Sequence, residues 1–301
     1  TLNVSNSLKI NKFDAAILEN LRQYIYVFKE NKFLDNKKDF GKLSRISETF
    51  QKCYLGDKST GVSFSNLFND LEIDYSRYIY FYLTYLVENS RVDDAKNLTN
   101  DLNYINTTLL LSQGKDWIEN ENAEKLVNFF SCKNPNDIIG EFLFLISNLY
   151  SSQDNFKKSN FFLNLSNFLN PKFIFNLSLT SENQFFNGEY NKAKKTLKNF
   201  NKEDNFYYWY RVKKEAQIIA KQRNNKESLN YIAAEFNKID NLNDKILFDI
   251  ANFYKRSKEY NKAIEYYTKI IDTLNDSSEI KPDLLYRLSL IHISEPTRQW
   301  Q

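Results

Sequence analysis

Residues 243–275 alternate hydrophobic and polar positions at helical spacing, in the stretch NDKILFDIANFYKRSKEYNKAIEYYTKIIDTLN. Leu247, Ile250 and Tyr254 recur at steps of three and four, and a second set with the same steps begins at Tyr260. Such spacing places each set on one face of an α-helix. The stretch therefore predicts two short antiparallel helices.

Small residues mark where the two helices of each predicted pair approach closely. They occur in pairs twelve positions apart, and the second members follow one another at intervals of 34, 35 and 35 positions. Large hydrophobic residues flank each pair, as close helix crossings require. The four pairs are Ser147 and Ser159, Ser181 and Ala193, Ala216 and Ser228, and Ala251 and Ala263. The pattern predicts stacked copies of one helical hairpin.

These hairpins resemble the tetratricopeptide repeat, which has a period of about 34 residues. Aromatic residues mark the turn between helices in three copies, at Phe156, Tyr190 and Tyr260, and Asn225 departs from this in the other. The resemblance is strong over residues 134–288 and weak before them. It implies an all-α fold, an α-solenoid in which antiparallel helix pairs form a right-handed superhelix.

Three regions follow from the repeat pattern. Residues 1–133 are predicted to form irregular hairpins of the same kind, beginning with one long helix to about Lys32. Residues 134–288 form the regular array, opened by a helix cap at Asn134. In the first region large residues, such as Leu83, stand where the repeat needs a small one. An irregular helical bundle remains an alternative, chiefly for that region.

The last segment, residues 289–301, is predicted to be foreign to the protein. Its sequence, within LSLIHISEPTRQWQ, resembles translated adapter or vector sequence at the end of an assembled gene. The chain's one histidine, His292, lies there. Histidine-based catalysis and histidine metal sites are therefore not expected.

Composition narrows the possible functions. A formal net charge of +3 on 301 residues gives no general electrostatic attraction to nucleic acid. No apolar stretch approaches the roughly 20 residues of a membrane-spanning helix. Cys53 and Cys132 lie far apart and lack metal-ligand spacing, so ordinary thiols are expected. No cofactor, metal or small-molecule substrate is predicted, and the chain is not expected to be an enzyme.

The chain opens on Thr1 without an initiator methionine, so its natural N-terminus is expected to be missing. A bacterial origin is also expected. It is expected to be a soluble protein of either the cytoplasm or the periplasm. An enzyme domain attached outside residues 1–301 is a further alternative.

The resemblance to tetratricopeptide repeats also implies a binding site for a protein or peptide. In that family the concave groove is lined by exposed residues of each first helix. An alternative is a helical-repeat RNA binder that uses the basic C-terminal part of the groove. Carried over to this chain, the groove residues are Phe144, Asn148, Phe175, Glu182, Phe185, Phe186, Tyr210, Lys213, Gln217, Lys221, Lys245, Phe248, Asn252, Lys255 and Arg256.

Overall fold

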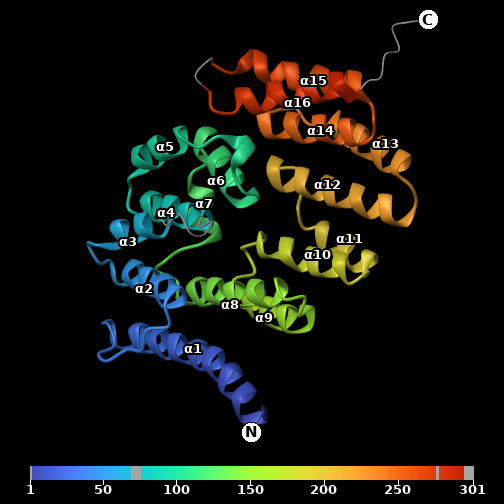
Figure 1. Cartoon of the computed structure of the whole chain (residues 1–301). Coiled ribbons are helices and arrows are strands. Elements are labelled where there is room, and N and C mark those ends of the chain that lie inside the picture. Colours follow the sequence, from blue (N-terminus) through green and yellow to red (C-terminus); the bar gives the residue numbers. More distant parts are fainter. Residues whose placement is uncertain (1, 69–75, 241, 276–277, 295–301) are drawn as a thin grey trace, which may run out of the picture. The chain divides into compact units, whose positions relative to one another are not determined.

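The computed structural model describes residues 2–68, 76–240, 242–275 and 278–294, and within these ranges it contains helices and no strand (Figure 1). The predicted all-α fold is therefore confirmed. The helices of the first half are α1 (Leu2–Glu30), α2 (Lys42–Leu55), α3 (Thr60–Phe68), α4 (Ser76–Glu88), α5 (Val92–Asn100), the 3₁₀ turn η1 (Tyr104–Asn106), α6 (Leu109–Glu119) and α7 (Glu124–Phe129). Those of the second half are α8 (Pro135–Ser151), α9 (Phe156–Leu169), α10 (Asn176–Phe186), α11 (Tyr190–Leu197), α12 (Asn205–Gln222), α13 (Asn225–Phe236), α14 (Asp244–Arg256), α15 (Tyr260–Thr273) and α16 (Lys281–Ser294).

The helices fall into two compact units. Unit 1 comprises residues 1–101 and 110–199, and unit 2 comprises residues 102–109 and 200–301. In unit 1 the pairs α8 with α9 and α10 with α11 pack against each other. In unit 2 the pairs are α12 with α13 and α14 with α15, and α16 packs on α15. The superhelical hand of the array and its predicted boundary between residues 133 and 134 stay predictions.

The predicted pairs of small residues lie where the paired helices touch. Ser147 and Ser159 are fully buried, and their hydroxyl oxygens are 2.8 Å apart. Ser228 donates a hydrogen bond of 2.7 Å to the carbonyl of Ala216. A small side chain lets the backbones come this close, and the serine hydroxyl satisfies a buried carbonyl at the same time. The helical hairpins predicted from the twelve-residue spacing are confirmed.

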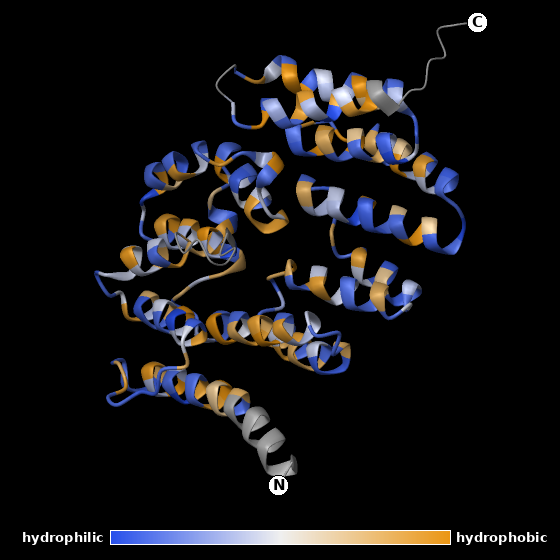
Figure 2. Ribbon diagram, viewed as in Figure 1, coloured by the Kyte–Doolittle hydropathy of each residue, from blue (hydrophilic) through white to orange (hydrophobic). Residues whose placement is uncertain are grey.

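The core of unit 2 shows why a single hairpin cannot stand alone. Ala251 and Ala263 are fully buried between α14 and α15, in one hydrophobic cluster that runs from Tyr208 on α12 to Ile291 on α16. Figure 2 shows hydrophobic and hydrophilic residues alternating along these ribbons, as in amphipathic helices. Each hairpin therefore buries its remaining apolar face against its neighbours.

The N-terminal half has the predicted helices but not the regular pairing. The expected long first helix is present as α1, and α4 and α5 form one irregular hairpin of this region. Leu83, large where the repeat has a small residue, is fully buried in α4. The short helix α7 packs against α4. Residues 1–133 thus keep the helical content of the repeats and lose their uniform geometry.

The prediction of two ordinary thiols is wrong. Cys53 of α2 and Cys132, which follows α7, form a disulfide with their Cα atoms 5.6 Å apart. Both residues are buried. The 79 positions between them had suggested separate thiols, but the packing of the N-terminal helices brings α2 beside the segment that leads into α8. The bond closes a large loop within unit 1.

A carboxylate on α1 holds the loop that follows this helix. Glu19 is buried and accepts hydrogen bonds from the Arg22 guanidinium at 2.8 and 2.9 Å, from the Gln23 amide at 3.0 Å and from the backbone N–H of Lys38 at 3.2 Å. The hydrogen bond from Arg22 is the main cause that lowers the pKa of Glu19 to about 2. These bonds stabilise the charged carboxylate in the folded chain.

We predict that Glu19 makes folding stability depend on acid pH. Its pKa is lower in the folded than in the unfolded chain, so its contribution is complete above the unfolded pKa and is lost as the pH falls from 4.5 toward 2. Because Arg22 is half exposed, we expect about 1 to 2 kcal/mol. Urea unfolding of wild type and Glu19→Gln between neutral pH and pH 2 measures it. A constant difference between the two chains would contradict the assignment.

Candidate functional site

On the first helices of unit 1, an arginine of the chain itself covers two of the predicted groove residues. Arg77, in the first turn of α4, places its guanidinium 4.0 Å from the ring centroid of Phe144 on α8 and 4.8 Å from that of Phe175, which precedes α10. It donates to both carboxylate oxygens of Glu141, at 2.6 and 2.8 Å, and to the side-chain oxygen of Asn176 at 3.2 Å. We call these five residues the Arg77 cluster.

The Arg77 cluster is enclosed, with side-chain exposures of 18% for Arg77 and 2% for Glu141. Burial raises the pKa of Glu141, and Arg77 opposes that shift by its charge and hydrogen bonds. A planar guanidinium suits both a bidentate carboxylate and the faces of aromatic rings. Phe144 and Phe175 are therefore committed to contacts within the chain.

The other predicted residues of unit 1 are more accessible. Asn148 on α8 and Phe186 at the end of α10 are exposed, and Phe185 and Glu182 are half-buried. The rings of Phe185 and Phe186 meet edge to face with their centroids 5.5 Å apart. This pair leaves an aromatic edge open at the end of α10.

In unit 2 the predicted lysines divide into paired and open ones. Lys213 of α12 forms an ion pair of 2.6 Å with Asp249 of α14, and the same carboxylate oxygen accepts the indole N–H of Trp209 at 3.0 Å. Lys245 donates to the backbone carbonyls of Tyr104, Ile105 and Thr107, at 3.2, 3.3 and 2.7 Å. Burial lowers the pKa of the Lys245 ammonium. Both lysines hold the unit together.

Phe248 and Asn252 of α14 contact Arg287 of the next helix, α16. The guanidinium of Arg287 lies 5.0 Å from the Phe248 ring centroid and 3.4 Å from the side-chain oxygen of Asn252. Asn252 also accepts the phenolic O–H of Tyr267 at 2.8 Å. Two predicted groove residues of α14 thus contact an arginine of α16 that sequence reasoning had not selected.

The remaining cations lie near the C-terminal ends of α12 and α14. Lys221 and Arg256 are exposed and Lys255 is half-buried, and within the described ranges these three form no ion pair. Gln217, one turn before Lys221, is exposed as well. Lys221 and Arg256 occupy equivalent repeat positions, 35 residues apart, and each follows a residue of the Lys213–Asp249 ion pair by about two helical turns. Tyr210 is half-buried on the same helix.

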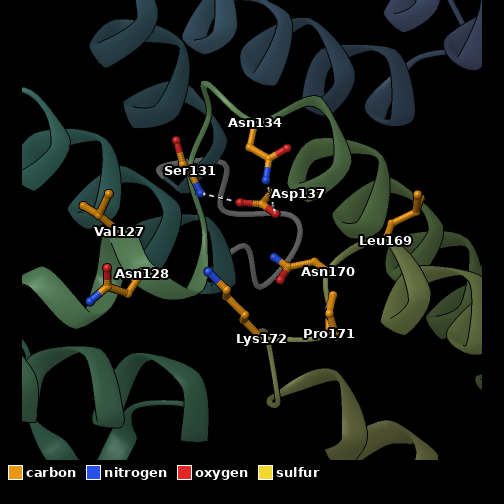
Figure 3. Close-up of a pocket in the computed structure, with 9 residues that line it drawn as sticks. All are labelled: Val127, Asn128, Ser131, Asn134, Asp137, Leu169, Asn170, Pro171 and Lys172. Carbon is orange, nitrogen blue, oxygen red and sulfur yellow. Dashed lines mark hydrogen bonds between the residues drawn. The ribbon is translucent and has the colours of Figure 1, made fainter.

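A polar cavity of about 320 Å³ opens at the start of α8 (Figure 3). Its lining residues Ser131, Asn134 and Asp137 are already bonded to one another. The Asp137 carboxylate accepts the backbone N–H of Ser131 at 2.9 Å and the side-chain amide of Asn134 at 2.9 Å. Asn134 in turn accepts the N–H of Asn136, which confirms the predicted helix cap. These groups serve the helix terminus.

Metal binding and membrane spanning find no support in the part of the chain that the structure describes. No group of three or more His, Cys, Asp or Glu side chains there could hold a metal ion. No described helix is both long enough and apolar enough to cross a bilayer. The side chain of His292 and the end of the tail, 295–301, lie outside the described residues.

Comparison with known proteins returned one kind of match. The chain is similar to the structure titled "Crystal Structure of P58(IPK) TPR Domain at 2.5 A", with 13% sequence identity and a TM-score of 0.27, over 93% of this chain and 99% of that one. No family model matches the chain, and no curated protein matches it. The fold assignment therefore depends on the helix pairs described above and not on these comparisons.

Sequence reasoning missed Arg77 and Asp249, which contact predicted groove residues in unit 1 and unit 2. Arg77 lies outside the regular repeats, and its contacts with Glu141 and Asn176 span 64 and 99 positions. Asp249 was passed over because it falls between two groove positions. Asp249 could have been predicted from its position one residue after Phe248 on α14, because a side chain there can reach α12, the preceding first helix.

Proposed function

We propose that this chain is a non-catalytic scaffold that binds an extended protein segment on the faces of its first helices in unit 2. The observation that supports this most directly is the group of open cations, Lys221, Lys255 and Arg256, on two helices that the Lys213–Asp249 ion pair joins. Rigid helices present these charges at fixed spacing. A partner with carboxylates at matching spacing would associate faster, and its binding register would be fixed by these charges.

The partner would carry acidic residues with large apolar residues between them. Phe248 lies one to two turns before Lys255 on α14, and although the Arg287 guanidinium lies 5.0 Å from its ring centroid the residue is only partly buried, so an apolar side chain of the partner would meet the accessible part of the ring. Burial of aromatic groups supplies most of the affinity in such interfaces, while exposed charges contribute less.

The RNA alternative is less well supported. It relied on a basic stripe that included Lys213 and Lys245, but Lys213 is neutralised by Asp249 and Lys245 is bound to backbone carbonyls. Only three cations of that stripe remain open within the described part of unit 2, and a phosphate backbone needs many such contacts.

A disulfide also bears on where the scaffold works. Disulfides persist in oxidising compartments and are rare in a reducing cytoplasm. We therefore favour the periplasm, of the two compartments expected from the sequence, because Cys53 and Cys132 are joined and buried.

Peptide binding tests the proposal. Fluorescence anisotropy would compare a peptide library of alternating acidic and large apolar residues with one in which Asn and Gln replace the acids. Replacing Lys221, Lys255 and Arg256 with alanine should weaken binding of the acidic library by about tenfold. The matched control removes three exposed lysines, Lys192 and Lys195 of α11 and Lys198 directly after it. Equal weakening by both variants, or tighter and strongly salt-dependent binding of single-stranded RNA, would contradict the proposal.

A further inference from the structure

The outer face of α9 carries three exposed hydrophobic side chains in one stripe. Phe161 is 59% exposed, Leu165 38% and Phe168 82%. They follow one another at steps of four and three residues, so they project from the same side of the helix. We call these three residues the α9 stripe.

The inner face of α9 is buried against α8. Ser159, Leu163 and Ser166 are fully buried, and Ser166 donates a hydrogen bond of 2.6 Å to the carbonyl of Gly140. The α9 stripe lies on the opposite side and takes no part in these contacts. An amphipathic helix with one face in the core normally presents polar residues on the other. This helix presents phenylalanine instead.

The other second helices show that these positions are solvent positions. At the matching places of the repeat, α13 and the residue after it carry Asn230, Ala234 and Asn237, and α15 carries Glu265, Lys269 and Asp272. All six are exposed. The repeat fold therefore does not require hydrophobic residues there, and the α9 stripe needs another explanation.

Charge near the α9 stripe is mostly positive: the nearest acidic side chains are Asp154, three positions before Lys157, and the largely buried Asp137 beside Lys172. Lys157 lies one turn before Phe161 and Lys172 four residues after Phe168, and both are exposed. The sequence from Asn155 to Ser181 contains no Asp or Glu. A partner of this face must therefore accept phenylalanine side chains and supply negative charge over the same surface.

We propose that the α9 stripe and its two flanking lysines dock on the surface of an anionic lipid bilayer. Phenylalanine side chains enter the boundary between headgroups and acyl chains, and lysines beside them meet the negative headgroups. A flat bilayer accepts side chains that project from the outside of a helix. A second copy of the chain would instead oppose lysine to lysine in a symmetric contact. This attachment is separate from the proposed peptide site on α12 and α14.

Vesicle sedimentation with the full chain tests the inference. Phosphatidylcholine vesicles are compared with vesicles that also contain phosphatidylglycerol. The stripe variant, Phe161→Asn/Leu165→Ala/Phe168→Asn, gives α9 the neutral residues found at the matching positions of α13 and the residue after it, and leaves the net charge unchanged. We expect wild type to bind the anionic vesicles and the stripe variant to bind them about tenfold more weakly or worse.

Two further variants separate charge from folding. Lys157→Ala/Lys172→Ala should also reduce binding, whereas Lys226→Ala/Lys269→Ala, which removes the same charge from unit 2, should not. A circular dichroism spectrum and an unfolding curve like those of wild type show that the stripe variant is folded. Three results would overturn the inference: wild type that ignores anionic vesicles, a stripe variant that binds as well as wild type, or a wild-type dimer in solution that the stripe substitutions dissociate.

Discussion

Replacing Arg77 with methionine should lower the free energy of unfolding by about 3 to 5 kcal/mol, because it leaves a buried carboxylate without its counter-ion. Glu141 is 2% exposed at its side chain, and Arg77 supplies both of the hydrogen bonds that its oxygens receive in the Arg77 cluster. Phe144 and Phe175 lose the guanidinium between them at the same time. Urea unfolding at neutral pH measures the loss.

The pH dependence of this loss identifies its cause. Burial already raises the pKa of Glu141, and removing Arg77 raises it further. A neutral carboxyl does not need the guanidinium, so the difference between wild type and variant should shrink as the pH falls. A loss caused by poor packing alone would not change in this way.

Two comparisons make the result specific. Arg91 and Asp94 form an ion pair of 2.6 Å with side chains 48% and 50% exposed, so Arg91→Met should cost less than about 1 kcal/mol. The double variant Arg77→Met/Glu141→Leu should recover much of the lost stability, because it removes the uncompensated charge. If Arg77→Met costs no more than Arg91→Met, the Arg77 cluster does not have the proposed role.

The parts of the fold that the sequence predicts are those governed by local spacing. Each second helix of the regular array begins at the residue that the turn pattern had marked: Phe156, Tyr190, Asn225 and Tyr260. A twelve-residue spacing places two small residues opposite each other in a hairpin, and nothing distant is needed to read it. The helix pairs could therefore be predicted copy by copy.

The candidate site could be predicted only in outline. A groove position carried over from the repeat fixes the place of a residue on its helix. It does not fix which other residues of the chain that side chain contacts. Lys245 was expected to face a ligand, and the structure ties it to carbonyls up to 141 positions earlier in the chain. Phe144 was expected to be open, and Arg77 from an irregular helix covers it. Such contacts depend on tertiary packing, which has no local period.

Reduction of the disulfide should destabilise unit 1 by about 2 to 4 kcal/mol. Cys53 and Cys132 are 79 positions apart, so their bond restricts a long loop of the unfolded chain. Closing a longer loop removes more conformational entropy from the unfolded state, which is the principal source of the stabilisation in this description. The bond also fixes the segment before α8 on α2, beside the core that contains Phe50 and Phe130.

The decisive measurement is urea unfolding with and without dithiothreitol, on wild type and on Cys53→Ala/Cys132→Ala. The free energy of unfolding of wild type should fall when the reductant is added. The variant should have the lower value in both conditions, and the reductant should not change it. Thiol titration of the oxidised chain after unfolding should find no reactive cysteine. Two reactive thiols in protein isolated from an oxidising compartment would contradict both the disulfide and the periplasmic assignment. Two buried free thiols would also give no response to dithiothreitol, so the reductant distinguishes them from a disulfide.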